Sequence, residues 1–302
     1  MSSLSVVIPS WNTREYLAEC LRTLGAADKP STEVIVIENA SADGSAEFVA
    51  EHHPEVQLVR NAINEGFARG SNQGMRLARG RYVLLLNTDT EMYPDALRRL
   101  YDFLEQNPAY GAVAPRLVHR DGRTQKTVQD FPTLWTALFF STPLERWFPN
   151  SPELRRYYIT GWEQEDSRDV AQPPAACLLV RRAVLDQIGL FDEDLWLLYN
   201  DVDFSKRMQA AGWKTRYLAE AKVVHHVGGS TSKFAEFVTT WQKDRLRYYR
   251  KHHGRFGAWW LKGCVTFTFA DWILRQWGKR RRGEPFELVR PMLAYYRKFL
   301  WM

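Results

Sequence analysis

Short apolar runs alternate with amphipathic stretches along the first third of the chain. We predict strands at residues 5–8, 33–37, 56–60 and 82–86, and helices at residues 13–24, 41–50, 66–78 and 94–106. Largely apolar strands that are separated by helices are typical of a parallel sheet with helices on both faces. The pattern therefore predicts an α/β fold with a Rossmann-like, mostly parallel sheet.

The pattern changes after residue 110. Prolines interrupt it between residues 111 and 170, where we expect a crossover and loops. Farther on we predict strands at residues 175–181, 215–218 and 222–226, helices at residues 182–189, 201–211, 236–252 and 256–277, and a flexible glycine-rich loop at residues 228–232. A length of 302 residues is enough for about two domains. We expect one domain over residues 1–232, with halves at about 1–110 and 111–232, and a helical extension over residues 233–302.

Polar residues follow three of the predicted strands. They are Ser10-Trp11-Asn12, Glu38-Asn39 and Asn87-Thr88-Asp89. Ligands of open α/β sheets bind beyond the carboxyl ends of the strands, so these clusters predict a nucleotide-type site on one rim. The glycine pattern of dinucleotide-binding proteins does not follow the first strand, and the chain has no Walker A sequence.

Three groups near this rim carry the chemistry. Asp89 ends a strand, where a carboxylate can bind a divalent cation that also holds a diphosphate; the alternative is a turn or helix cap. Asp201 and Asp203 do not share a helix face, so one can act as a general base; the alternative is that both only stabilise a helix N-terminus. Of His225 and His226, at most one faces a metal, and a structural histidine is the alternative.

The ordered set of segments resembles the family 2 glycosyltransferases, which have the GT-A fold. The resemblance covers about residues 4–232. It rests on eight segments, at residues 5–12, 38–45, 64–68, 72–74, 85–89, 190–193, 199–204 and 224–230. Within the family, the chain is most similar to rhamnosyltransferase-like members.

The resemblance implies an inverting transfer of a sugar, with dTDP-rhamnose as the expected donor, to a glycan or polyprenyl-linked glycan in polysaccharide biosynthesis. It implies Asp201 as the general base, and Mg²⁺ or Mn²⁺ bound by Asp89 with His225. The expected donor contacts are Pro9, Trp11, Glu38, Arg69, Asn72, Asn87, Thr88 and Asp89. Residues 1–110 would then be the nucleotide-sugar half and residues 111–232 the acceptor half.

Three positions depart from the family pattern. Asn87 stands at the first acidic position of the D-x-D motif, and Asn200 stands where relatives have glutamate. Glu38 replaces an aspartate that contacts the nucleobase in relatives. A catalytically inactive module that binds nucleotide sugars is therefore an alternative, although Asp89 and Asp201 are retained.

The positive charge is concentrated in the C-terminal fifth. Residues 242–302 contain 15 Lys/Arg and 4 Asp/Glu, a net of +11, so the other residues carry −5 of the total of +6. Trp259, Trp260, Phe267, Leu274 and Trp277 can form one helical stripe, followed by residues 279–282, which are all basic. This composition predicts that residues 256–282 contact an anionic membrane surface; the alternative is packing on the catalytic domain or in a homodimer.

Other features exclude several classes of protein. A nucleic-acid-binding protein is the alternative that a basic, aromatic tail raises. The net positive charge is confined to the tail and no nucleic-acid motif accompanies it, so we expect no nucleic-acid partner. The three cysteines are far apart, which disfavours disulfides and zinc. No apolar run is long enough to span a membrane, so we expect a cytoplasmic protein that is peripheral on the inner face of the membrane.

Overall fold

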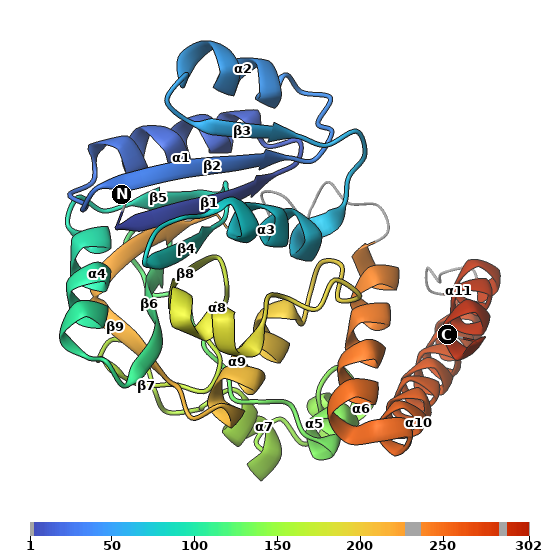
Figure 1. Cartoon of the computed structure of the whole chain (residues 1–302). Helices are drawn as coiled ribbons and strands as arrows, with labels where there is room; N and C mark the ends of the chain where they lie inside the picture. The colour runs from blue at the N-terminus through green and yellow to red at the C-terminus, as the bar shows by residue number, and fades with distance from the viewer. Residues whose placement is uncertain (1–2, 227–236, 284–288, 302) are drawn as a thin grey trace. The chain divides into compact units, whose positions relative to one another are not determined.

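The computed structural model describes residues 3–226, 237–283 and 289–301 (Figure 1). The glycine-rich stretch expected to be a loop, residues 228–232, lies outside the described residues. Contacts divide the chain into two compact units. The first contains Met1–Gln129 and Gly161–Ala235, and the second contains Asp130–Thr160 and Glu236–Met302. Residues 130–160, which lie within the expected acceptor half, therefore belong to the same unit as the C-terminal helices.

The first unit is built on a nine-stranded sheet with the order β3-β2-β1-β4-β8-β6-β9-β5, in which β7 also pairs with β9. The strands are β1 (Leu4–Ser10), β2 (Thr32–Glu38), β3 (Gln57–Arg60), β4 (Tyr82–Leu86), β5 (Thr90–Met92), β6 (Tyr110–Val118), β7 (Arg168–Asp169), β8 (Cys177–Arg181) and β9 (Lys214–His225). β3, β2, β1 and β4 are parallel, whereas β8 is antiparallel to both β4 and β6. The sheet is thus parallel in its N-terminal half and mixed beyond β4.

Helices cover both faces of this sheet, as the apolar strands predict. The helices are α1 (Arg14–Ala26), α2 (Ser45–His52), α3 (Gly66–Leu77), α4 (Ala96–Gln106), α8 (Arg182–Ile188) and α9 (Asn200–Ala210). Apolar residues of α1, α2 and α4 form one core with the sheet, and those of α3, α8 and α9 form the other (Figure 1). Burial on two sides explains why β4 is apolar along its whole length.

Two interpretations of the central region were wrong. Residues 110–118 form a strand, β6, although Pro115 suggested a loop; the ladder shifts register between Pro115 and Arg116, which accommodates the missing N–H. Residues 215–218 and 222–226 are parts of one long strand, β9, because the same register shift lets it continue beside β6.

The second unit is helical. It comprises α5 (Leu134–Phe139), α6 (Pro143–Trp147), α7 (Pro152–Tyr157), α10 (Phe237–Arg281) and α11 (Val289–Trp301). Pro143 and Pro152 start helices, because proline at the first helical position lacks only an N–H that has no helical partner. We expected loops at the positions of α5, α6 and α7, whereas α11 lies within the helical extension expected over residues 233–302.

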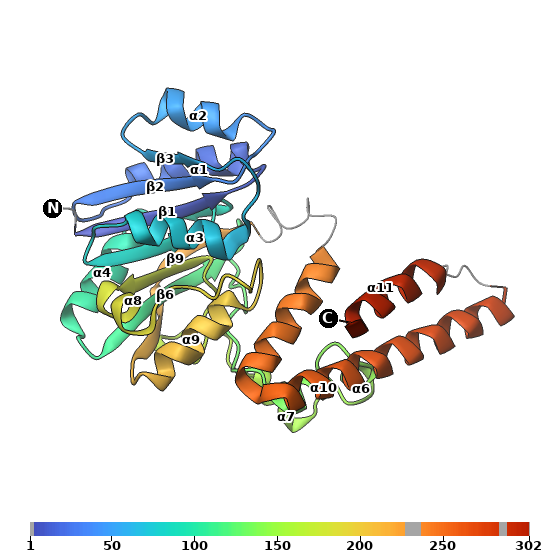
Figure 2. The ribbon, with the colours of Figure 1, turned by 45° about the vertical axis from the view of Figure 1, so that its right-hand side comes forward.

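α10 bends at Gly254, where φ is 66°. Gly254 lies between the two helices predicted for this region. α11 runs alongside it (Figure 2), with the Tyr296 and Phe269 rings stacked 4.4 Å apart. Among the residues that the structure describes, no helix combines the length and the apolar character needed to cross a membrane.

Glycine allows α3 to pack closely on β1. A Cβ atom at Gly74 would overlap the side chain of Val7, which is fully buried, whereas a Cβ at Gly25 in α1 has nothing within 4 Å. Gly74→Ala should therefore destabilise the protein by about 1–3 kcal/mol through overpacking. Gly25→Ala, the matched control, should stabilise it by up to about 1 kcal/mol because alanine favours the helix. Urea denaturation midpoints check both values; equal effects of the two substitutions would contradict the proposed close packing.

Candidate active site

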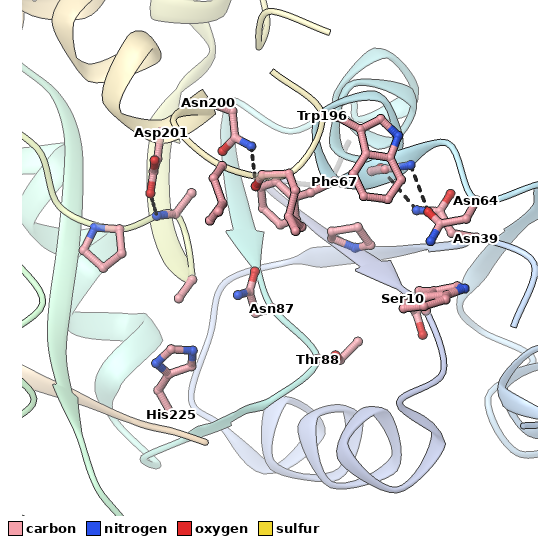
Figure 3. Close-up of a pocket in the computed structure, with 18 residues that line it drawn as sticks. Ser10, Asn39, Asn64, Phe67, Asn87, Thr88, Trp196, Asn200, Asp201 and His225 are labelled. Carbon is pink, nitrogen blue, oxygen red and sulfur yellow. Dashed lines mark hydrogen bonds between the residues drawn. The ribbon is translucent and has the colours of Figure 1, made fainter. Parts of the chain in front are cut away.

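A cavity of about 250 Å³ lies at the carboxyl ends of β1, β2 and β4. Pro9, Ser10 and Trp11 line it from the end of β1, Asn39 from the end of β2, and Asn87 and Thr88 from the end of β4. Asn200, Asp201 and His225 line it from the start of α9 and the end of β9 (Figure 3). The cavity therefore occupies the rim at which the sequence predicted a nucleotide-type site.

Unusual backbone conformations shape this rim. Asn12 follows β1 with a φ of 52°, Ala40 follows β2 with a φ of 57°, and Tyr199 precedes α9 with a φ of 61°. Residues other than glycine adopt such left-handed conformations at a cost of about 1–3 kcal/mol, and they are concentrated at functional sites. The turn at Tyr199 allows the chain to enter α9 with Asp201 at the cavity wall.

Asp201 presents a carboxylate at one end of the cavity. Its Oδ2 accepts a hydrogen bond from the Ala175 N–H at 3.3 Å, and its Oδ1 accepts from the Val202 N–H at 2.8 Å. Burial raises the pKa of the Asp201 carboxyl above its ordinary value, and these backbone hydrogen bonds oppose the shift. A carboxylate with a raised pKa is a better proton acceptor than an exposed one.

Asp203 has a different environment from Asp201. It is fully buried, and its Oδ2 accepts from Arg207 Nε one turn along α9, at 2.8 Å. The N–H of Asp203 also donates to the Tyr199 carbonyl. Of the two acidic residues that the sequence singled out, only Asp201 lines the cavity.

Asn87 and Thr88 follow β4 and lie between the two sides of the cavity (Figure 3). The Asn87 N–H donates to the Ala176 carbonyl at 2.9 Å, which extends the ladder between β4 and β8 by one residue. The side-chain Oδ1 of Asn87 is buried and has no hydrogen-bond partner within residues 3–226, 237–283 and 289–301. A buried acceptor in this state favours a ligand that brings a donor or a cation.

The side chains of Asp89 and His225 lie close together near Asn87. Antiparallel pairing of β5 with β9 aligns Thr90 with His225, and the His226 N–H donates to the Asp89 carbonyl at 2.8 Å. The Asp89 Oδ1 and His225 Nε2 atoms are 3.6 Å apart. Burial lowers the pKa of His225, against the opposing effect of the Asp89 carboxylate.

His226 points away from the cavity, as the alternation of side chains along a strand requires. Its Nε2 lies 2.6 Å from Glu91 Oε1, and its ring lies 5.4 Å from that of Tyr16. The sequence left open which of the two histidines faces the rim, and the structure places His225 there.

Four expected donor contacts do not line the cavity: Asp89, which lies beside His225, and Glu38, Arg69 and Asn72. The Glu38 carboxylate accepts from the Ser41 N–H at 2.9 Å and so supports the turn after β2. Arg69 forms ion pairs with Glu65 and Glu193 on the surface of α3, at 3.2 and 3.4 Å. The Asn72 amide both donates to and accepts from the backbone of Phe191 at 3.0 Å, which ties α3 to the loop before α9.

Two aromatic residues line the opposite wall: Phe67, which lies in a motif segment, and Trp196, which no motif singled out. Trp196 projects from the loop before α9, and its carbonyl accepts from the Phe67 N–H at 2.9 Å. A Cβ at Gly66 would lie 2.5 Å from the Trp196 ring, so glycine is required there, as its φ of 85° also indicates. The only signal in the sequence was the apolar run at residues 195–198 before the acidic motif.

The side chains near Asn87 fit a divalent cation that is also bound by the substrate. Asp89 Oδ1 and Asn87 Oδ1 are oxygen ligands of the kind that Mg²⁺ and Mn²⁺ prefer. The imidazole nitrogen His225 Nε2 is a ligand that a transition-metal ion such as Mn²⁺ accepts more readily than Mg²⁺ does. In the described part of the chain, no three His, Cys, Asp or Glu side chains come together closely enough to hold a metal. A cation at Asp89 would therefore take its other ligands from substrate phosphates or water, as Mg²⁺ usually does.

Comparison with known proteins identifies the class of enzyme. The model of the family described as "Glycosyl transferase family 2" matches residues 5–189. N-acetylglucosaminyl-diphospho-decaprenol L-rhamnosyltransferase of Mycobacterium tuberculosis is 26% identical over 95% of this chain and 97% of its own length.

Solved structures show the same fold. The mannosyltransferase PcManGT from Pyrobaculum calidifontis, solved with GDP-Man and Mn²⁺, has a TM-score of 0.58 at 18% identity, covering 99% of this chain and 80% of its own. Residues 1–349 of S. aureus TarS, solved with UDP, have a TM-score of 0.51 at 17% identity, covering 89% and 72%. The expected GT-A fold is confirmed, and the chain belongs to glycosyltransferase family 2.

Proposed function

We propose that the chain transfers L-rhamnose from dTDP-rhamnose, with inversion at the anomeric carbon, to a glycan carried on a polyprenyl diphosphate. The observation that carries the proposal is the convergence of Asp201, Asn87, Thr88 and His225 on one cavity. The choice of sugar and acceptor is supported by the similarity to the Mycobacterium tuberculosis rhamnosyltransferase over nearly the whole of both chains.

The donor would lie along the rim of the parallel strands. Pro9 and Trp11 would flank the nucleoside, and Asn87 and Thr88 would face its diphosphate from the cavity wall. Asp89 does not line the cavity, and it would reach the diphosphate through the cation that it holds with His225. Asp89 and His225 would hold Mg²⁺ or Mn²⁺, which neutralises the charge that develops on the departing diphosphate. In this proposal Glu38, Arg69 and Asn72 do not contact the donor. They hold the surrounding loops in place.

Asp201 would act as the general base. As the acceptor oxygen forms its bond to the anomeric carbon, the bond from that carbon to the diphosphate oxygen breaks. The hydroxyl proton passes to the Asp201 carboxylate. Trp196 and Phe67 would exclude water and leave the acceptor hydroxyl as the nucleophile that reaches the sugar.

We also propose that one face of α10 contacts an anionic membrane surface. Phe256, Trp259, Leu274 and Trp277 are exposed there, with Trp259 at 73%. Trp260, expected in the same stripe, instead donates from Nε1 to the Leu134 carbonyl in α5, at 2.7 Å.

Basic residues flank this apolar face. Arg250, Arg255 and Lys262 surround a hollow next to Trp259, and the Arg281 guanidinium lies 3.6 Å from the centre of the Trp277 ring. Cations beside exposed tryptophans complement the phosphates of an anionic leaflet.

Asp201→Asn should abolish transfer but leave nucleotide binding unchanged, because the amide keeps the shape and loses the basic oxygen. The measurement is release of dTDP from dTDP-rhamnose in the presence of N-acetylglucosaminyl-diphospho-polyprenol. Asp194→Asn, an exposed residue of the same loop, is the control. Near-normal turnover of Asp201→Asn would exclude this base.

Because burial raises the pKa of Asp201, the wild-type rate should fall on acidification at a pH above the ordinary aspartate value of 3.8.

Asp89→Ala should weaken Mn²⁺ binding by at least about tenfold, since even loss of an outer-shell partner costs 10–100-fold. Electron paramagnetic resonance of free Mn²⁺ in a titration measures the affinity. Glu91→Gln is the matched control, because that carboxylate pairs with His226 away from the cavity. Equal losses in the two variants would contradict a cation at Asp89.

Replacing Trp259 and Trp277 together by alanine should reduce flotation with anionic vesicles at least about tenfold, since each removes over 1 kcal/mol of apolar burial. Trp135→Ala, which removes another tryptophan that is 61% exposed, should have no effect. Equal binding to phosphatidylcholine and phosphatidylglycerol vesicles would contradict the electrostatic contribution. A dimer that the double substitution converts to a monomer, without vesicle binding, would assign the face to a second subunit.

A further inference from the structure

Gln125 is a buried polar residue that lies next to His225 but is 100 positions away in sequence. It follows the turn after β6, where its N–H donates to the Leu117 carbonyl at 2.9 Å, and its side chain is only 4% exposed. It does not line the cavity, and no motif marks it. Its side-chain amide contacts His225 at both the ring and the backbone.

The neighbours of Gln125 fix the orientation of its amide. Nε2 lies 2.6 Å from the His225 carbonyl oxygen and 3.2 Å from the Val118 carbonyl oxygen. Both are acceptors only, so the group facing them must be the NH₂. The reversed amide would place its oxygen against two carbonyl oxygens at these distances. Oε1 therefore faces His225, at 3.1 Å from Nδ1.

The amide orientation in turn fixes the ring proton of His225. A carboxamide oxygen can only accept, so the hydrogen bond between Nδ1 and Oε1 needs a proton on Nδ1. In a neutral imidazole the other nitrogen, Nε2, then carries a lone pair. That lone pair lies 3.6 Å from Asp89 Oδ1. Two electron-pair donors thus point toward the same space, as they would around a cation.

We infer that Gln125 is a positioning residue that holds His225 in the Nδ1–H tautomer, so that Nε2 is free to bind the divalent cation together with Asp89. This inference rests on the cation site of the proposed function. Without Gln125, the ring is free to move its proton to Nε2, where it would donate to Asp89 and block the cation. Partners of this kind behind a ligating histidine set both its tautomer and its orientation.

Three variants test this role. Gln125→Met keeps the length of the side chain but removes both the donor and the acceptor. Gln125→Glu keeps an acceptor for the Nδ1 proton and loses the contacts to the two carbonyls. His119→Ala removes an exposed ring whose Nδ1 lies 3.3 Å from Gln125 Nε2 and leaves Oε1 in place, so it is the matched control.

The first measurement is the protonation of the imidazole nitrogens in metal-free protein labelled with ¹⁵N-histidine. The His225 signal is assigned by its loss in His225→Ala. We expect the Nδ1–H tautomer in the wild type, in Gln125→Glu and in His119→Ala, and a shift toward Nε2–H in Gln125→Met. An Nδ1–H tautomer that persists in Gln125→Met would overturn the inference, and this readout does not depend on metal binding or activity.

The second measurement is the Mn²⁺ dissociation constant of the same proteins. We expect it to rise about 10–100-fold in Gln125→Met and to change less than about threefold in the other two. Thermal melting of each variant shows that it is folded. Wild-type Mn²⁺ binding that Gln125→Met leaves unchanged would overturn the role of Gln125 alone. A wild-type protein with no Mn²⁺ affinity would overturn the proposed cation site and this inference with it.

Discussion

The close approach of the Asp89 carboxylate to the His225 ring is the interaction on which the site depends. Pairing of β5 with β9 brings these groups to 3.6 Å inside the protein, in the tautomer of His225 that Gln125 requires. A carboxylate and an imidazole lone pair at this distance repel each other unless something positive lies between them. In the proposed function, the second half of the sheet therefore holds a cation site beside the parallel strands, which would bind the nucleotide.

The rest of the cavity is arranged around that point by the backbone. Left-handed conformations at Asn12, Ala40 and Tyr199 turn the chain sharply at the ends of two strands and before α9. Their energetic cost must be offset by packing, such as the close contact of α3 with β1 that glycine permits. The result separates Asp201, which lines the cavity, from Asp203, whose charge is neutralised by Arg207 within α9.

The sequence predicted the parallel half of the fold well, because the signals there are local. β4 has the predicted bounds, residues 82–86, since burial on both faces requires an unbroken apolar run. β6 was missed because Pro115 normally excludes a strand, and only its pairing with β9 shows the register shift that accommodates it. Among the site residues, position and charge singled out Asp89 and Asp201 as candidates, and the family resemblance supplied the roles expected of them. Gln125 could not be, because its role exists only once the fold brings it to His225.

The proposed function requires that the rim binds a nucleoside diphosphate through a divalent cation at Asp89 and His225. The most direct test is the thermal stability of the purified protein with dTDP, UDP and GDP, each with and without Mn²⁺. A nucleotide at about 100 times its Kd should add roughly 2.7 kcal/mol to the free energy of unfolding. We predict a stabilisation by dTDP that disappears on chelation of the metal. A stabilisation that chelation leaves unchanged would contradict the cation site, and no stabilisation by any of the nucleotides would contradict the donor site as a whole.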